Sequence, residues 1–318
     1  MIKALALTGP TASGKTALSI ELAKTFGCEI ISLDSMQIYK KMDIGTAKAT
    51  PEEQGAVPHH MIDLISPNES FSAKSYKDMA MACALDITSR GKIPLFVGGT
   101  GLYLTTLLRP ECEGAPESDP AFRLEIEKSL VTEEDKIKLL ERLRAVDPES
   151  AESLHYNNTR RVIRALEVYE KTGKTKTYFD ALTKKKSDEI SVIHITLDFH
   201  DRENLYGRAN ARVDQMLKEG LLDEISALLS EGYLTEDCTA LQAIGYKEMT
   251  PVVTGEGDFS SAVEALKQAT RNYAKRQLTW FRHMEGAHTV FCDEEDGSLR
   301  SKKELLSECK AIFEEINK

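Results

Sequence analysis

An eight-residue loop near the start of the chain carries the residues best suited to bind phosphate. It runs Gly9-Pro10-Thr11-Ala12-Ser13-Gly14-Lys15-Thr16 and fits the pattern Gly-x-x-x-x-Gly-Lys-Thr. The glycines let backbone N–H groups turn toward phosphate oxygens at the positive end of a helix that follows. Lys15 adds a point charge, and the Thr16 hydroxyl can ligate Mg²⁺. We predict a soluble enzyme that grips a di- or triphosphate, with a flexible glycine-rich turn as the structural alternative.

The loop alone does not identify the phosphate. Most loops of this pattern hold ATP or GTP, but the sequence contains no Asn-Lys-x-Asp guanine motif. A GTPase is therefore disfavoured, and an ATP-dependent small-molecule kinase remains an alternative.

Two further polar segments follow short apolar runs, at 34–37 and 97–103. In a doubly wound sheet the carboxyl ends of the strands line the ligand crevice, so both segments should face a bound phosphate. Asp34 could ligate magnesium through water or act as a general base, or could cap a helix. Ser35 and Gln37 can hydrogen-bond a purine edge. Three glycines around Thr100 permit close backbone approach to a ligand, or form a tight structural turn.

Basic residues recur at helical spacing in three places. Arg208 and Arg212 share one face of a helix predicted over 204–222 and could clamp a leaving diphosphate, or form a solvated surface pair. Arg160 and Arg164 share a face of a second predicted helix. A third carries basic and aromatic side chains together, namely Arg271, Lys275, Arg282, Tyr273, Trp280 and Phe281. Such faces suit phosphate contacts and base stacking, although a solvated charged face is the commoner explanation.

The elements that must position these residues follow from short apolar runs with helical patterns between them. Each run is bounded by Gly, Pro or Asp, and the predicted strands are 2–8, 29–33, 93–97, 192–197 and 289–292. This alternation favours βαβ units. The fold class is therefore α/β, with a P-loop parallel sheet flanked by helices.

A charged stretch without strand signals, residues 115–190, interrupts this pattern. Asp119 followed by Pro120 predicts a helix start. Helical patterns then cover 122–130, 133–146 and 159–172. We predict an all-helical insertion domain at 115–190 within a P-loop catalytic core of 1–114 and 191–318, which ends in an amphipathic helix over 300–318.

Composition is that of a globular protein, with 41% hydrophobic and 29% charged residues among 318. No window is apolar enough to span a membrane, and the N-terminal run lacks a cleavage site, so we expect a cytoplasmic protein. Six scattered cysteines without a Cys-x-x-Cys pair argue against zinc and disulfides. His59-His60 lacks metal-ligand spacing and is predicted to be loop. The net charge of −10 hides basic clusters that could bind a polyanion, at 160–176, 184–186 and 267–283.

Eight blocks of the chain closely resemble the tRNA dimethylallyltransferase family. They occur in order, reach from the start to about residue 283, and occupy 9–16, 34–39, 43–48, 57–63, 97–103, 160–169, 242–247 and 274–282. The most specific are Gly-Pro-Thr-Ala-Ser-Gly-Lys-Thr, Asp-Ile-Gly-Thr-Ala-Lys and Val-Gly-Gly-Thr-Gly-Leu-Tyr. The resemblance is to the bacterial type, because the C-terminal zinc finger of many eukaryotic relatives is absent. Ala49 stands where the family usually has proline.

The resemblance implies transfer of a dimethylallyl group from dimethylallyl diphosphate to N6 of an adenosine. That adenosine lies immediately 3′ of the anticodon in a subset of tRNAs. Asp34 would accept the amine proton and Thr100 would orient the amine. The diphosphate would leave against the loop amides, Lys15, Mg²⁺ and one or both of Arg208 and Arg212.

The same resemblance implies which residues hold the tRNA anticodon stem-loop. The flipped base would enter a pocket of Asp34, Ser35, Met36, Gln37 and Thr100, with Gln37 reading it through its amide. The other implied contacts are Arg123, Arg160, Arg161, Val162, Ile163, Arg164, Gln242, Gly245, Tyr246, Lys247, Lys275, Arg276, Gln277, Trp280 and Arg282. We expect a monomer without membrane attachment. An isopentenyltransferase acting on free adenine nucleotides, which would not need the basic insertion helix, is a further alternative to the kinase.

Overall fold

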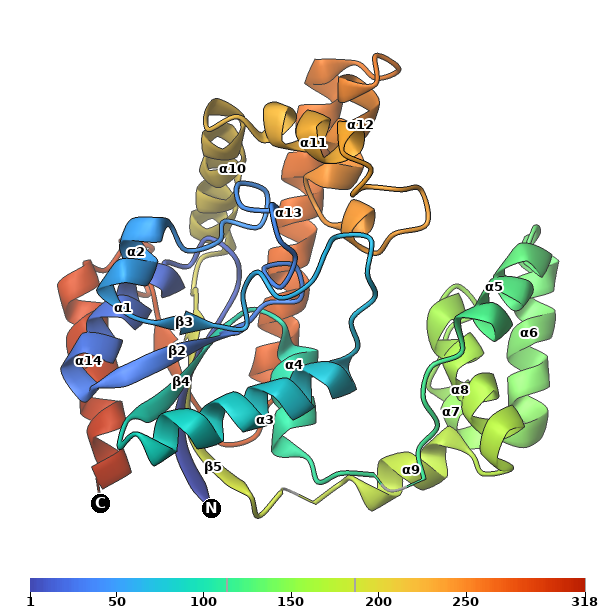
Figure 1. The fold of residues 1–318 in the computed structure, drawn as a ribbon, viewed down its shortest axis with the longest axis horizontal. Helices are drawn as coiled ribbons and strands as arrows, with labels where there is room; N and C mark the ends of the chain where they lie inside the picture. The colour runs from blue at the N-terminus through green and yellow to red at the C-terminus, as the bar shows by residue number, and fades with distance from the viewer. Residues whose placement is uncertain (113, 186, 318) are drawn as a thin grey trace. The chain divides into compact units, whose positions relative to one another are not determined.

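The computed structural model describes residues 1–112, 114–185 and 187–317 (Figure 1). Within these residues one six-stranded sheet forms in the order β3-β2-β4-β1-β5-β6, and every neighbouring pair is parallel. Its strands are β1 (Ile2–Thr8), β2 (Cys28–Leu33), β3 (His59–His60), β4 (Ile93–Gly98), β5 (Ile190–Asp198) and β6 (Ala287–Phe291). The predicted α/β class and all five predicted strands are confirmed.

The chain divides into two compact units, 1–107 with 189–318, and 108–188. Helices of the first unit are α1 (Lys15–Phe26), α2 (Pro51–Ala56), α3 (Ala73–Ser89), α4 (Gly101–Leu108), α10 (Arg202–Lys218), α11 (Leu221–Ser230), α12 (Tyr246–Val253), α13 (Phe259–Arg282) and α14 (Lys302–Phe313), with short 3₁₀ turns at Ala240–Gln242 and Glu314–Asn317. Helices α1 and α14 pack on one face of the sheet and α3 on the other (Figure 1). The opposite placement of α1 and α3 is what right-handed crossovers require, because the connections that contain them run in opposite directions along the sheet.

Two local predictions are wrong. The helix predicted over 204–222 ends at Lys218, and a new helix begins at Leu221 after Gly220, whose φ of 100° lies in the left-handed region. The pair His59-His60 is not loop, because it forms the edge strand β3 against β2. There the His60 ring bonds to the buried Glu29 carboxylate at 2.8 Å. A two-residue strand depends on its partner and leaves no periodic signal in the sequence.

The second unit is all helical and contains α5 (Pro120–Ser129), α6 (Glu133–Val146), α7 (Pro148–Glu152), α8 (Thr159–Thr172) and α9 (Lys176–Leu182). Asp119 caps α5 by accepting the Phe122 N–H at 3.0 Å, as its place before Pro120 predicts. The core of this unit is formed by apolar faces of α5, α6, α7 and α8.

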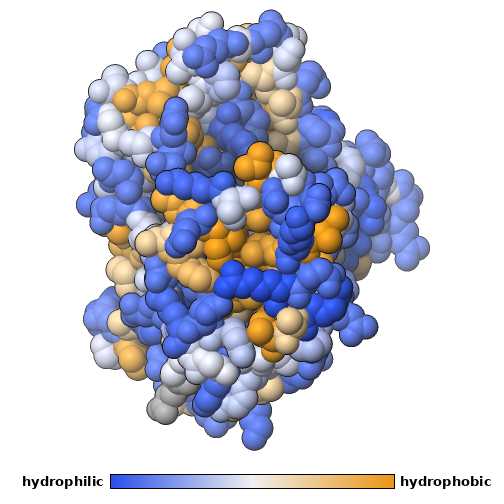
Figure 2. All heavy atoms as spheres, turned by 90° about the vertical axis from the view of Figure 1, so that its right-hand side faces the viewer, coloured by the Kyte–Doolittle hydropathy of each residue, from blue (hydrophilic) through white to orange (hydrophobic). Residues whose placement is uncertain are grey.

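The surface and the cysteines agree with the composition. Figure 2 shows one face covered largely by hydrophilic residues, with hydrophobic ones gathered toward its middle. Among the described residues, no helix is both long and apolar enough to cross a membrane. All six cysteines are free, and four of them are buried.

Candidate active site

The strand register brings the three polar segments to one edge of the sheet. Thr8 at the end of β1 and Leu33 at the end of β2 both pair with Gly98 at the end of β4. Only glycine fits at 98, because a Cβ there would lie 2.3 Å from the Leu33 carbonyl oxygen. The phosphate loop, the Asp34 segment and the Gly99-Thr100 turn therefore leave the sheet side by side.

The phosphate loop has the backbone geometry of an anion site. Gly9, Ala12 and Gly14 all have positive φ, at 142°, 64° and 92°. Helix α1 starts directly after Gly14, which has no side chain to cap the first turn. The first N–H groups of α1 therefore remain available to an anion at the positive end of the helix dipole.

Lys15 lies between the loop backbone and the cavity. Its Nζ donates to the carbonyl oxygens of Gly9 at 3.0 Å and Pro10 at 2.7 Å. Burial, reinforced by the charge of Arg212 and opposed by Asp34, lowers the pKa of Lys15 to about 7. A bound diphosphate would place negative charge beside Lys15 and so favour its charged form.

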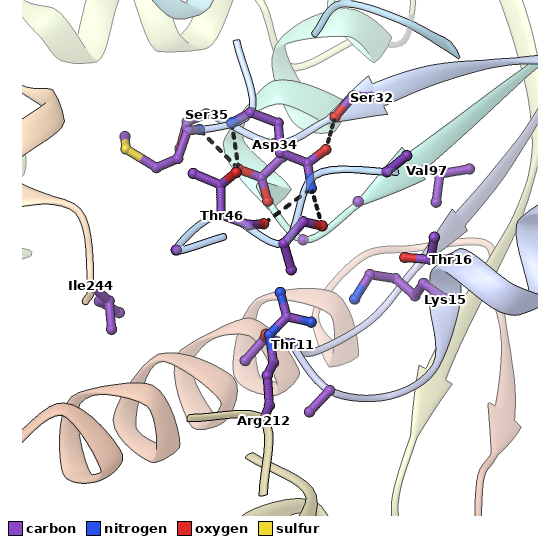
Figure 3. A pocket seen from close by; sticks show the side chains of 18 of the residues that line it. Thr11, Lys15, Thr16, Ser32, Asp34, Ser35, Thr46, Val97, Arg212 and Ile244 are labelled. Carbon is purple, nitrogen blue, oxygen red and sulfur yellow. Dashed lines mark hydrogen bonds between the residues drawn. The ribbon is translucent and has the colours of Figure 1, made fainter. Parts of the chain in front are cut away.

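The two arginines of α10 take different positions. The exposed Arg208 donates from Nε to the Ala12 carbonyl oxygen at 2.7 Å, so it braces the phosphate loop from outside. Arg212 reaches into the cavity near Lys15 (Figure 3). Burial lowers the Arg212 pKa, while Asp34 raises it. Both side chains lie at the loop, and only Arg212 points into the space where a diphosphate would lie.

Asp34 is held by the backbone that follows it. Its Oδ1 accepts N–H bonds from Met36 at 2.8 Å and Gln37 at 3.3 Å. Its Oδ2 has no hydrogen-bond donor among the described residues, and the side chain lies across the cavity from Lys15 and Arg212 (Figure 3). One oxygen thus orients the carboxylate, and the other is free to accept a proton. The helix-capping alternative is wrong, because the next helix along the chain begins only at Pro51.

Thr100 is connected to Asp34 through the intervening backbone. Its hydroxyl accepts the N–H of Ser35 at 3.1 Å, while its own N–H bonds to the Leu33 carbonyl oxygen at 2.9 Å. Burial raises the pKa of Tyr273 on α13. Tyr273 lines the cavity, yet the sequence marked it only as one aromatic residue of a basic helix.

These groups surround a cavity of about 540 Å³ within the first unit. Its polar side includes Thr16, Lys15, Asp34 and Arg212, and apolar lining comes from residues such as Ile30, Met36, Val97, Met216 and Ile244. The cavity thus combines convergent charged and polar groups with apolar side chains, a combination that can bind a small molecule with both kinds of surface.

Gln37 is engaged differently from the prediction. Its Oε1 accepts the Ser32 hydroxyl at 2.9 Å, and its Nε2 donates to the carbonyl oxygens of Thr46 and Ala47, each at 3.3 Å. Both ends of the amide thus hold the 45–47 loop against β2. A base-reading role would have to compete with these bonds.

In the first unit, several residues implied to contact tRNA are buried or already bonded to other side chains of the protein. Tyr246 is fully buried and donates to Glu224 at 2.6 Å, so its side chain offers no surface. Arg282 forms two 2.7 Å bonds to the buried Asp198. Gln277 is buried. Gly245 is buried too, whereas the remaining side chains are exposed, namely Gln242, Lys247, Lys275, Arg276 and Trp280.

In the insertion unit the arginines of α8 fall into two groups, one exposed to solvent and one bonded to a buried carboxylate. Arg160 and Arg161 are exposed. Arg123 and Arg164 both bond to the buried carboxylate of Glu167, at 2.7 and 2.6 Å. Val162 and Ile163 are each 1% exposed in the helical core, so contact with tRNA through their side chains is excluded by burial.

Comparison with known proteins places the chain in one family. The model of the IPP transferase family matches residues 37–284. The chain is 44% identical to the tRNA dimethylallyltransferase of Thermoanaerobacter sp. (strain X514) over 306 residues, 96% of each protein, and 48% identical to that of Bacillus velezensis over 304 residues, 95% of each.

Solved structures give the same result. The tRNA delta(2)-isopentenylpyrophosphate transferase of Staphylococcus epidermidis is 42% identical, with a TM-score of 0.70 and 99% of each chain covered. A eukaryotic dimethylallyltransferase acting on tRNA is 32% identical, with a TM-score of 0.74, 92% of this chain covered and 74% of the other. The phosphate loop, the carboxylate across the cavity and these matches lead to one conclusion: the chain belongs to the tRNA dimethylallyltransferase family.

Proposed function

We propose that the protein transfers a dimethylallyl group from dimethylallyl diphosphate to N6 of the adenosine immediately 3′ of the anticodon in a subset of tRNAs. The observation that carries the proposal is one cavity with an anion site on one side and the Asp34 carboxylate on the other. A kinase would need the loop to hold ATP. Membership of the family favours a prenyl diphosphate instead.

The reaction is a substitution in which charge moves toward the phosphate loop. The N6 lone pair forms a bond to C1 of the allyl group as the C1–O bond breaks, and that bonding pair leaves with the diphosphate. The N6 proton passes to Oδ2 of Asp34, because the amine is a poor nucleophile until it loses that proton. Lys15, Arg212 and the N–H groups at the start of α1 stabilise the charge that grows on the diphosphate.

Magnesium fits the donor set of this site. The Thr16 side chain is exposed at the start of α1 and lines the cavity that Asp34 also lines. Among the described residues no group of three or more His, Cys, Asp or Glu side chains could hold a metal. Mg²⁺ prefers a few protein oxygens with water and phosphate, so Thr16 and the diphosphate would hold it. When bound, it would neutralise charge on the leaving group.

We propose that exposed basic residues bind the tRNA stem-loop. Arg160 and Arg161 in the insertion unit, and Lys275 and Arg276 on α13, have side chains that can reach phosphates. Trp280 is 38% exposed and offers an indole face on which a base could stack. We expect the enzyme to act as a monomer in the cytoplasm.

The direct test is incubation of the protein with labelled dimethylallyl diphosphate, unmodified tRNA and Mg²⁺. We expect label on one adenosine next to the anticodon and release of diphosphate. Phosphoryl transfer from ATP without label on the RNA would instead support a kinase. Label on free adenine nucleotides but not on tRNA would support the other alternative.

A further inference from the structure

Gln277 joins two loops that reach the cavity from different strands. Its Oε1 accepts the backbone N–H of Thr11 at 2.8 Å, and its Nε2 donates to the carbonyl oxygen of Gly99 at 3.0 Å. The residue is 5% exposed. A Cβ at position 99 would lie 2.0 Å from Nε2, so the amide fills the space that glycine leaves.

The two loops carry opposite halves of the proposed reaction. Thr11 belongs to the phosphate loop, whereas Gly99 precedes Thr100, whose hydroxyl accepts the N–H of Ser35 next to Asp34. Hydrogen bonds therefore run from the leaving-group side through Gln277 to the side that holds the general base. A misplacement of reacting groups by about 1 Å can lower a reaction rate about a hundredfold. The distance between the phosphate loop and the Gly99-Thr100 turn therefore affects catalysis.

We propose that Gln277 is a positioning residue that fixes the phosphate loop relative to the Gly99-Thr100 turn, and not a tRNA contact. The inference rests on the proposed function, because it assigns the two loops to donor and acceptor. Tyr273, one helical turn earlier on α13, lines the same cavity. Through Gln277, α13 contacts the loops on both sides of the cavity.

The two hydrogen bonds of Gln277, to Thr11 and to Gly99, form a bridge between the loops, and two substitutions test this bridge. Gln277→Ala removes both hydrogen bonds, and Gly99→Ala pushes a methyl group into the amide. We expect each to lower kcat roughly tenfold or more with both substrates saturating, while the tRNA dissociation constant stays within about twofold. Gln268→Ala, an exposed glutamine on the same helix, is the matched control and should leave both constants unchanged.

The double variant gives the decisive measurement. Once Gln277 is alanine, the methyl group of Gly99→Ala meets no amide, so the second change should lower kcat less than about threefold further. Effects that multiply in full would overturn the proposal, because the two positions would then act independently. A tenfold weaker tRNA complex with normal kcat in Gln277→Ala would also overturn it, and would make Gln277 a tRNA contact.

Two controls separate this inference from protein stability and from the proposed function. Thermal unfolding of each variant shows whether it is folded, and if Gln277→Ala is not, Gly99→Ala, which keeps the glutamine, carries the kcat test. Binding of inorganic diphosphate is measured without tRNA, and Gln277→Ala should weaken it roughly fivefold or more because the phosphate loop loses the hydrogen bond that fixes its position at Thr11. If the unaltered protein transfers no label, the proposed function fails. An unchanged diphosphate affinity in Gln277→Ala contradicts the bridge alone.

Discussion

Lys15 offers the sharpest test of the phosphate site, because its amine should gain a proton when the ligand binds and lose it when the ligand dissociates. In the free protein, burial and the charge of Arg212 lower its pKa to about 7 from a normal value of about 10.4. A diphosphate bound beside it reverses the balance and restores the charged form. Binding should therefore take up a proton from solution in the pH range above about 7.

The magnitude follows from the two pKa values. With a pKa of about 7, Lys15 is about half neutral at pH 7 and about nine-tenths neutral at pH 8. If the bound form stays charged, binding takes up about 0.5 proton at pH 7 and about 0.9 at pH 8. The complex binds more protons than the free protein, so affinity falls as pH rises, by up to about tenfold per pH unit above 7.

Titration calorimetry with an unreactive thiolo analogue of dimethylallyl diphosphate measures this uptake. Binding enthalpies are compared in two buffers of different ionisation enthalpy across this pH range. Lys15→Met should abolish the uptake, and Arg212→Gln should reduce it at pH 7, because removing that positive charge raises the Lys15 pKa. Equal heats in both buffers for the unaltered protein, or the same uptake in Lys15→Met, would refute the argument.

Three further substitutions probe separate parts of the protein. Asp34→Ala should abolish transfer in single-turnover assays while sparing tRNA binding, and near-normal chemistry would exclude Asp34 as the base. Arg160→Ala should weaken tRNA binding and reduce the slope of log affinity against log salt by about 1, whereas an unchanged slope would place the side chain in solvent only. Glu167→Gln, which weakens the bonds to Arg123 and Arg164, should destabilise the insertion unit by about 1–3 kcal/mol in urea unfolding. A change below about 0.5 kcal/mol would contradict that estimate.

The central strands could be predicted because they are buried on both faces. Continuous apolar runs such as 2–8 and 93–97 carry that burial directly in the sequence. The helix break at Gly220 was missed because Leu217 and Leu221 flank it four residues apart, the spacing of one continuous helix. Strand β3 was missed because its two histidines have no apolar alternation, and only pairing with β2 makes them a strand.

The candidate site was predictable where chemistry is concentrated in short motifs. Lys15, Asp34 and the Gly99 turn stood out because their residue types suit phosphate, proton and close backbone contacts. Burial of Tyr246 could not be seen, since an aromatic residue beside a lysine looks the same whether it faces solvent or the core. The role of Gln277 was hidden for the same reason, because an amide on a basic helix resembles a polar surface residue.

The remaining wall of the cavity shows why local motifs alone cannot define this site. One carboxylate, that of Glu224 on α11, accepts the backbone N–H groups of Asp43 and Ile44 at 2.8 Å, and of Gly45 at 3.1 Å. It also accepts the hydroxyl of Tyr246, whose ring leaves no room for a Cβ at Gly45. All four partners are donors, so an amide at this position would turn an N–H toward an N–H. The loop that holds Gln37 is therefore fixed by a residue about 180 positions later in the chain, and the chemical groups of the motifs are aligned only when the whole first unit is folded.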